Sequence, residues 1–142
     1  MKRHPSLIPL SREHHDTLIQ AQVIKKDAPE YLSMPTTLEG KKDSAVSHFN
    51  HHLKSHFKKE EEQLFQKIKG KHADVDELIT QLTNEHRQIE SLVNSIDKNE
   101  SLEENLNQLG ILLENHIRKE ERQLFELIPK KFEDSFLDEI VL

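Results

Sequence analysis

The feature that most constrains the fold is a helical periodicity that continues along nearly the whole chain. Apolar residues recur every three or four positions, glycine occurs only three times in 142 residues, and no stretch has the alternation typical of a strand. The pattern therefore predicts an all-α chain. Long helices are expected at residues 11–26, 36–69, 74–97 and 101–128, with a short helical segment within residues 130–142.

Capping residues and helix breakers set these boundaries. The predicted starts are an N-cap serine and three capping boxes: Ser11, Thr36-x-x-Glu39, Asp74-x-x-Glu77 and Ser101-x-x-Glu104. The predicted ends coincide with breakers: Asp27-Ala28-Pro29, Gly70, Asp97-Lys98-Asn99 and Pro129. Helices of this length with short connections predict an antiparallel up-down four-helix bundle with a short C-terminal helical segment. We expect one domain over residues 1–142.

Composition argues against several classes of protein. The formal net charge is −6, and phosphate binding needs a basic face, so nucleic acid is not an expected partner. No apolar run approaches a membrane span, and the N-terminus lacks the apolar core of a secretion signal. Cysteine is absent, which fits a reducing cytoplasm. The chain has ten histidines, and histidine is the commonest metal ligand.

One phrase occurs twice. HFKKEEEQLF spans residues 56–65 and HIRKEERQLF spans residues 116–125, and seven of the ten positions are identical. Each copy places a glutamate four residues after a histidine, so both side chains lie on one face of a helix. The same spacing joins His86 to Glu90. Two helix hairpins related by a pseudo-twofold axis would explain the repeat.

Apolar neighbours predict that these polar residues face the core. Leucine and isoleucine flank each His-x-x-x-Glu pair, and His15 is followed at helical spacing by Leu18, Ile19 and Val23. A buried charge without a partner is costly, and a metal ion would remove that cost by binding imidazole nitrogen and carboxylate oxygen. The candidate ligands are His15, His56, Glu60, His86, Glu90, His116 and Glu120.

The ligand types favour iron. Seven nitrogen and oxygen ligands exceed the four of a closed zinc site, and carboxylates from two helices suit bridging between two ions. A set without sulfur indicates two iron ions, with manganese or zinc as alternatives. The competing ferritin-like bundles carry Glu-x-x-His on two helices, a pattern that this sequence lacks.

Together the segments LSREHHDTLI, HFKKEEEQLF, NEHRQIESLV and HIRKEERQLFELIP resemble the hemerythrin-like, or HHE cation-binding, family. The resemblance covers nearly the whole chain and implies a non-haem di-iron centre in an up-down four-helix bundle. It implies that His15 and His56 hold one iron, that His86 and His116 hold the other, and that Glu60 and Glu120 bridge them.

Some assignments stay open at this point. His14 competes with His15, because Glu13-His14 matches Glu85-His86, and Glu121 competes with Glu120. Oxygen-carrying relatives have a second histidine where Glu90 stands, and they space the last carboxylate one residue further on. Both departures argue against reversible oxygen carriage. His52, one turn before His56, is either exposed or behind the ligands; the oligomeric state and protein partners are not determined by the sequence.

Three functions are consistent with the sequence. The first is a di-iron protein that binds or senses oxygen, nitric oxide, peroxide or iron. The second is a di-iron redox enzyme that consumes peroxide or nitric oxide with an external electron donor, since no reductase or cofactor motif is present. The third is a structural helical bundle with surface histidines, which predicts no bound metal.

Overall fold

The computed structural model describes residues 3–28 and 34–142, and every regular element in these two ranges is a helix. The predicted all-α class is therefore confirmed. None of the helices in the described ranges has the length and apolar character needed to cross a membrane. That residues 1–142 form one domain stays a prediction.

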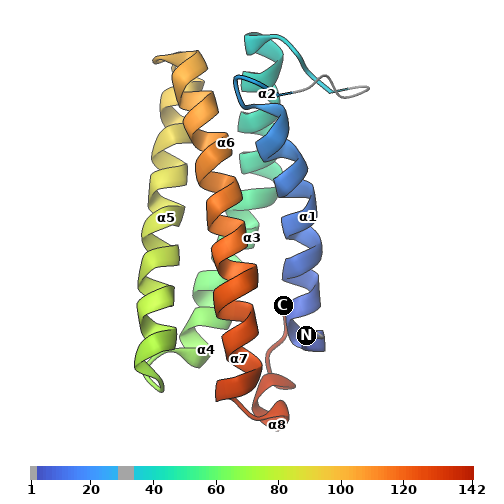
Figure 1. Ribbon diagram of the computed structural model, residues 1–142, viewed down its shortest axis with the longest axis vertical. Helices are drawn as coiled ribbons and strands as arrows, with labels where there is room; N and C mark the ends of the chain where they lie inside the picture. The colour runs from blue at the N-terminus through green and yellow to red at the C-terminus, as the bar shows by residue number, and fades with distance from the viewer. Residues whose placement is uncertain (1–2, 29–33) are drawn as a thin grey trace.

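Helical rods, some of them made of several consecutive helices, lie side by side along the long axis of the molecule (Figure 1). The first is α1 (Ile8–Val23), preceded by a 3₁₀ turn at Pro5–Leu7. The second rod joins α2, α3 and α4 through two π-helical segments: Leu38–His48, Phe49–Leu53, Lys54–Lys59, Glu60–Phe65 and Gln66–Ile68. The third is α5 (Ala73–Asp97). The fourth rod joins α6 to α7 through a further π-helical segment: Leu102–Lys119, Glu120–Leu124 and Phe125–Lys131.

Contacts between rods hold this arrangement together. Helix α6 packs against both α5 and α1, and α2 contacts α1, α5 and α6. The short helix α8 (Asp134–Leu137) follows the fourth rod, at the end of the molecule where the two chain termini lie (Figure 1). It corresponds to the short helical segment expected within residues 130–142.

The helix starts differ from the predicted ones. Helix α1 begins at Ile8, so Ser11 lies inside it, and its hydroxyl donates a hydrogen bond to Glu121 Oε2 at 3.1 Å. The cap of α2 is Thr37, not Thr36: its side chain accepts from the Gly40 backbone N–H. Ser101 occupies the N-cap position of α6 with a φ of 40° and makes no side-chain cap bond. The sequence predicted the N-cap positions to within a few residues, but it did not predict the hydrogen bonds made there.

The helix ends match more closely. Gly70 follows the second rod with a φ of 81°, a left-handed conformation that glycine adopts without strain. Helix α5 ends at Asp97, as predicted. The fourth rod continues through Pro129 to Lys131, and Pro29, the predicted breaker after α1, lies outside the described residues.

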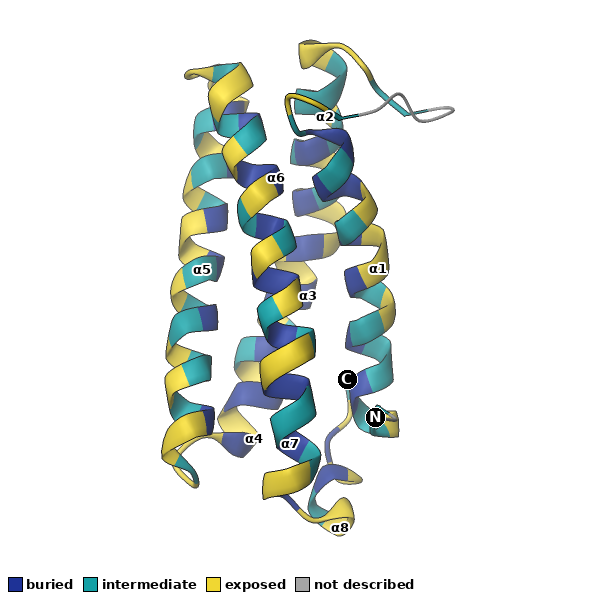
Figure 2. Ribbon diagram, viewed as in Figure 1, coloured by how far each residue is buried: buried dark blue, intermediate teal, exposed yellow. Residues whose placement is uncertain are grey.

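Two apolar clusters fill the bundle and leave a polar layer between them. The first surrounds Leu10, Leu82 and Phe125 near the chain termini, and the second surrounds Ala21, Ile89 and Leu113 toward the opposite end. Buried positions form inward-facing stripes on the rods in Figure 2. On α5 the first cluster ends with Leu82, the second begins with Ile89, and His86 lies between them. The polar layer is thus enclosed above and below by apolar side chains.

Helices α1 and α6 approach each other closely at Gly110. A Cβ atom there would lie 2.6 Å from the Ala21 carbonyl oxygen and 2.8 Å from Lys25 Cγ. Alanine normally stabilises a helix interior relative to glycine by about 1 kcal/mol. Here we expect Gly110→Ala to destabilise the protein instead, by about 1–3 kcal/mol, because the two backbones must separate. Thermal or urea unfolding measures the change, and Gln108→Ala, on the other side of the same turn, is the control.

Candidate metal centre

Six buried polar side chains meet in the layer between the two apolar clusters. They come from all four rods and divide into two groups: His14, His56, Glu60 and Glu120 in one, and His86, His116, Glu60 and Glu120 in the other. Within each group the candidate ligand atoms all lie within 4.8 Å of one another. Both glutamates belong to both groups, so the layer contains two adjacent nitrogen and oxygen sites that share two carboxylates.

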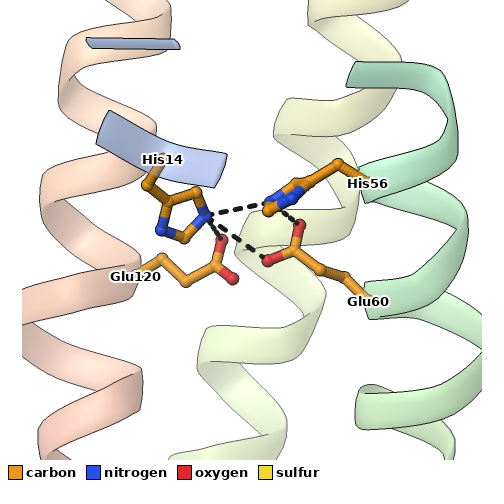
Figure 3. Close-up of side chains that lie close together, drawn as sticks. All are labelled: His14, His56, Glu60 and Glu120. Carbon is orange, nitrogen blue, oxygen red and sulfur yellow. Dashed lines mark hydrogen bonds and ion pairs between the residues drawn. The ribbon is translucent and has the colours of Figure 1, made fainter. Parts of the chain in front are cut away.

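The first group is drawn in Figure 3. His14 reaches in from α1, His56 and Glu60 from the second rod, and Glu120 from the fourth. The Nε2 atoms of His14 and His56 are 3.0 Å apart. His14 Nε2 lies 3.8 Å from an oxygen of each glutamate, and His56 Nε2 lies 3.3 Å from Glu60 Oε1. All four side chains point toward one small volume.

The second group has similar geometry. His86 Nε2 lies 3.2 Å from Glu60 Oε1, and His116 Nε2 lies 3.5 Å from Glu120 Oε2. Among the described residues, the two carboxylate oxygens of Glu60, those of Glu120 and the Nε2 atoms of His86 and His116 are buried without a hydrogen-bond partner. Each such atom costs about 1–3 kcal/mol. Metal coordination would satisfy all six at once, so the residues present fit a metal site.

Burial and charge perturb the titration of this layer. Burial opposes ionisation of Glu60, but the neighbouring imidazoles of His56, His14 and His86 outweigh it and hold the pKa of this carboxyl well below its usual range. Burial also disfavours a charged His14, yet its hydrogen bond to Glu121 and the nearby Glu60 raise its pKa to about 9. Burial lowers the pKa of His116. Without a metal, a proton on His14 compensates part of the negative charge at Glu60, and a metal ion would displace that proton.

A second ring of carboxylates orients the four histidines. Each histidine bonds a glutamate through Nδ1: His14 to Glu121 at 3.0 Å, His86 to Glu61 and His116 to Glu85 at 2.7 Å, and His56 to Glu13. An ionised carboxylate can only accept hydrogen bonds, so Nδ1–H is the donor in each case. In a neutral imidazole this bond leaves the lone pair on Nε2, the atom that faces the shared glutamates. His14 reaches this form once it gives up its second proton, as it would on metal binding. This is the arrangement that metal-binding histidines require.

Each outer carboxylate has a cation behind it. Lys59 pairs with Glu13 at 2.9 Å, Arg3 with Glu121 at 2.9 Å, Lys119 with Glu85, and Arg87 with Glu61. The hydrogen bond from His56, together with Lys59, lowers the pKa of Glu13 to about 2. The pKa values of Glu85 and Glu121 are also lowered, because their histidine and cation partners outweigh the effect of burial. Glu13, Glu85 and Glu121 therefore stay ionised and keep accepting from the imidazoles.

The repeated phrase has the same structure in both copies. Both copies change from α- to π-helix at the buried glutamate, Glu60 in one and Glu120 in the other, and π-helical turns are often associated with functional sites. The next glutamate in each copy bonds a histidine on a neighbouring rod. The final phenylalanine stacks on that same histidine: Phe65 on His86 at 6.2 Å and Phe125 on His14 at 5.7 Å between ring centroids.

Two predicted ligands lie outside the cluster. His15 is exposed on the outer side of α1, and His14 takes the inward position. The apolar neighbours were misleading here, because Leu18 and Ile19 lie on the outer side, whereas the inner face carries the polar residues Thr17 and Gln20. Glu90 turns away from the layer and pairs with Arg87 at 2.9 Å. The structure brings together the other five: His56, Glu60, His86, His116 and Glu120.

The outer glutamates were missed from the sequence. Glu61 was not among the predicted site residues, and Glu121 was considered only as an alternative ligand to Glu120; both are instead partly buried partners of histidines. Glu62, the next residue of the first run, is exposed. Two signals could have identified the ring: the Glu-His dipeptide that occurs twice, at Glu13 and Glu85, and the second glutamate that both copies of the phrase retain.

A helical bundle with paired histidine and carboxylate groups buried at its centre has the features of a metal-binding protein. Residues 9–128 match the family described as Hemerythrin HHE cation binding domain. The chain belongs to this family. No significant match to the chain was found among curated proteins or among solved structures.

The two neighbouring histidines of α1 give a direct test of the site. We expect His14→Ala to lower the metal content of the purified protein by about half, because one group loses a nitrogen ligand. His15→Ala should leave the metal content unchanged, since this side chain points outward. Elemental analysis of both variants measures the difference, and metal loss in His15→Ala alone would contradict the assignment.

The outer carboxylates give a second test. Removing a carboxylate that orients a metal-binding histidine typically weakens metal binding about 10–100-fold. We expect Glu61→Ala and Glu85→Ala to weaken it by this amount, as measured by competition with a chromogenic chelator. Glu62→Ala, an exposed neighbour in the same run, is the matched control and should bind like the unsubstituted protein.

Proposed function

We propose that the protein is an antiparallel up-down four-helix bundle that holds two non-haem iron ions and binds or senses oxygen, a related small ligand such as nitric oxide or peroxide, or iron itself. The observation that supports this most directly is the pair of histidine and carboxylate groups that share Glu60 and Glu120. Two carboxylates common to two adjacent sites are suited to bridging two ions.

In this proposal His14 and His56 would hold one iron and His86 and His116 would hold the other, with Glu60 and Glu120 shared between the two sites. Imidazole and carboxylate ligands without thiolate favour iron, with manganese or zinc as alternatives. Each group offers four candidate ligands, so an iron ion held there would have room for a further, small ligand. A small ligand would bind there, where an iron ion supplies reversible redox chemistry.

The side chains around the proposed centre exclude water from it and hold its ligands in place. The two apolar clusters exclude bulk water from above and below, which strengthens every electrostatic interaction within the layer. Phe57 stacks on His86 with 3.9 Å between ring centroids, and this contact fixes the plane of the imidazole. Glu90 adds no carboxylate to the centre, because it turns outward and pairs with Arg87.

Metal analysis of the protein purified in air tests the proposal. We expect two irons per chain, with near-ultraviolet charge-transfer absorption from bridged ferric ions. Chelation should lower the melting temperature, because the six buried atoms lose their partners. Manganese or zinc in place of iron would overturn the choice of metal, and a bundle that contains no metal and is unaffected by chelators would overturn the proposal.

The reduced protein then distinguishes binding from catalysis. Reversible spectral changes with oxygen or nitric oxide support a binding or sensing role. Repeated consumption of peroxide or nitric oxide with an added electron donor would favour the alternative, a di-iron redox enzyme.

A further inference from the structure

Polar side chains form a continuous row along the seam between α1 and the second rod. Ser44, His48, His52 and His56 follow one another at four-residue intervals on the second rod. Ser44 bonds Gln20 and His48 bonds Thr17, each at 2.9 Å. The rings of His48 and His52 are 5.2 Å apart. The row ends at His56, which belongs to the candidate metal centre. Neither group of candidate ligands includes Ser44, His48 or His52.

A pocket opens along this row. It has a volume of about 90 Å³, enough for several water molecules. Its polar lining comes from both sides of the seam: Glu13, Asp16, Thr17, His48, His52, Ser55 and His56. The pocket therefore extends from exposed side chains, Asp16 and His52, to one of the buried histidines of the centre.

His56 connects the pocket to the shared carboxylates. Its Nδ1 faces Glu13 in the pocket wall, and its Nε2 faces Glu60 at 3.3 Å. Glu13 is more than one third exposed, so its side chain is in contact with solvent as well as with His56. An ion in the pocket is thus separated from the centre by a single imidazole.

We propose that this pocket is the entry site through which a divalent cation, Fe²⁺ in the proposed function, reaches the centre. His48, His52 and Asp16 capture the hydrated ion, and Glu13 and His56 pass it inward. The inference rests on the proposed function, since it names the route by which that site is filled.

The lining is suited to a cation in particular. Carboxylate oxygens and neutral imidazoles are ligands for divalent first-row metals. Burial and the neighbouring His52 lower the pKa of His48 to about 4, so His48 has a free lone pair at neutral pH. A pocket near the other half of the centre is lined by three cations, Lys54, Lys58 and Arg87, and by three glutamates, Glu61, Glu62 and Glu90, so its formal charges cancel. The lining of the seam pocket carries two carboxylates and no lysine or arginine, so the α1 seam is the favoured route.

The rate of metal uptake tests the entry site. Metal-free full-length protein is mixed with Co²⁺ or anaerobic Fe²⁺, and uptake is followed by absorbance in a stopped-flow instrument. We expect the double variant His48→Gln/His52→Gln to load about tenfold more slowly than the unsubstituted protein, because local capture raises the association rate by at least this factor. The final metal content and the melting temperature of the loaded protein should not change.

The chain provides a matched control and a second variant. His51→Gln removes an exposed histidine of the same turn that does not line the pocket, and it should load at the normal rate. Asp16→Asn/His52→Gln changes only exposed side chains, so it should fold normally and also load slowly. Normal loading of both double variants, or equal slowing by His51→Gln, would overturn the inference.

Two further outcomes distinguish an entry site from a structural role and from a passage for small ligands. A lower final metal content in the double variants would make these residues ligands or structural groups and would overturn an entry role. Slower binding of azide to the loaded protein, with unchanged metal uptake, would identify a small-ligand passage instead. If the unsubstituted protein takes up no metal, the proposed function fails; if it binds two ions and only the rates are unaffected, the entry site alone fails.

Discussion

The structure depends on two carboxylates at the middle of the core. Glu60 and Glu120 are fully buried, where an ionised group without compensation is strongly destabilising. Every polar feature of the layer reduces this cost. Four imidazoles surround the pair, four outer glutamates orient the imidazoles, and a lysine or arginine partners each outer glutamate. Carboxylates therefore alternate with nitrogen-bearing side chains from the centre of the bundle to its surface.

The repeated phrase produces much of this alternation. Each copy contributes a histidine, a shared glutamate and an outer glutamate, and the outer glutamate bonds a histidine that belongs to another rod. Glu61 bonds His86, and Glu121 bonds His14. The Glu-His dipeptides of α1 and α5 complete the pattern, because Glu13 bonds His56 and Glu85 bonds His116. These paired contacts agree with the pseudo-twofold relation that the repeat suggested.

The sequence predicted the fold class and most of the cluster because both follow from periodicity. Three histidines and two glutamates lie on helical faces whose apolar neighbours are buried, so their direction could be derived. Helix α1 was different, since its inner face carries Thr17 and Gln20 and its outer face carries Ile19. Hydrophobicity then indicated the wrong side and selected His15. The outer glutamates could not be derived either, because their partners lie on other rods and depend on packing.

The division of each ligand set among rods has a consequence for how the site is assembled. Neither group of ligands can form within one pair of rods. His14 and His56 lie on the first and second rods, for example, but Glu121, the carboxylate that orients His14, lies on the fourth rod. Both ions would also compete for the same two glutamates, so ordering these carboxylates around the first ion prepares the position of the second. Occupancy of the two proposed sites would thereby be coupled, so the affinity for the second ion would depend on whether the first is bound.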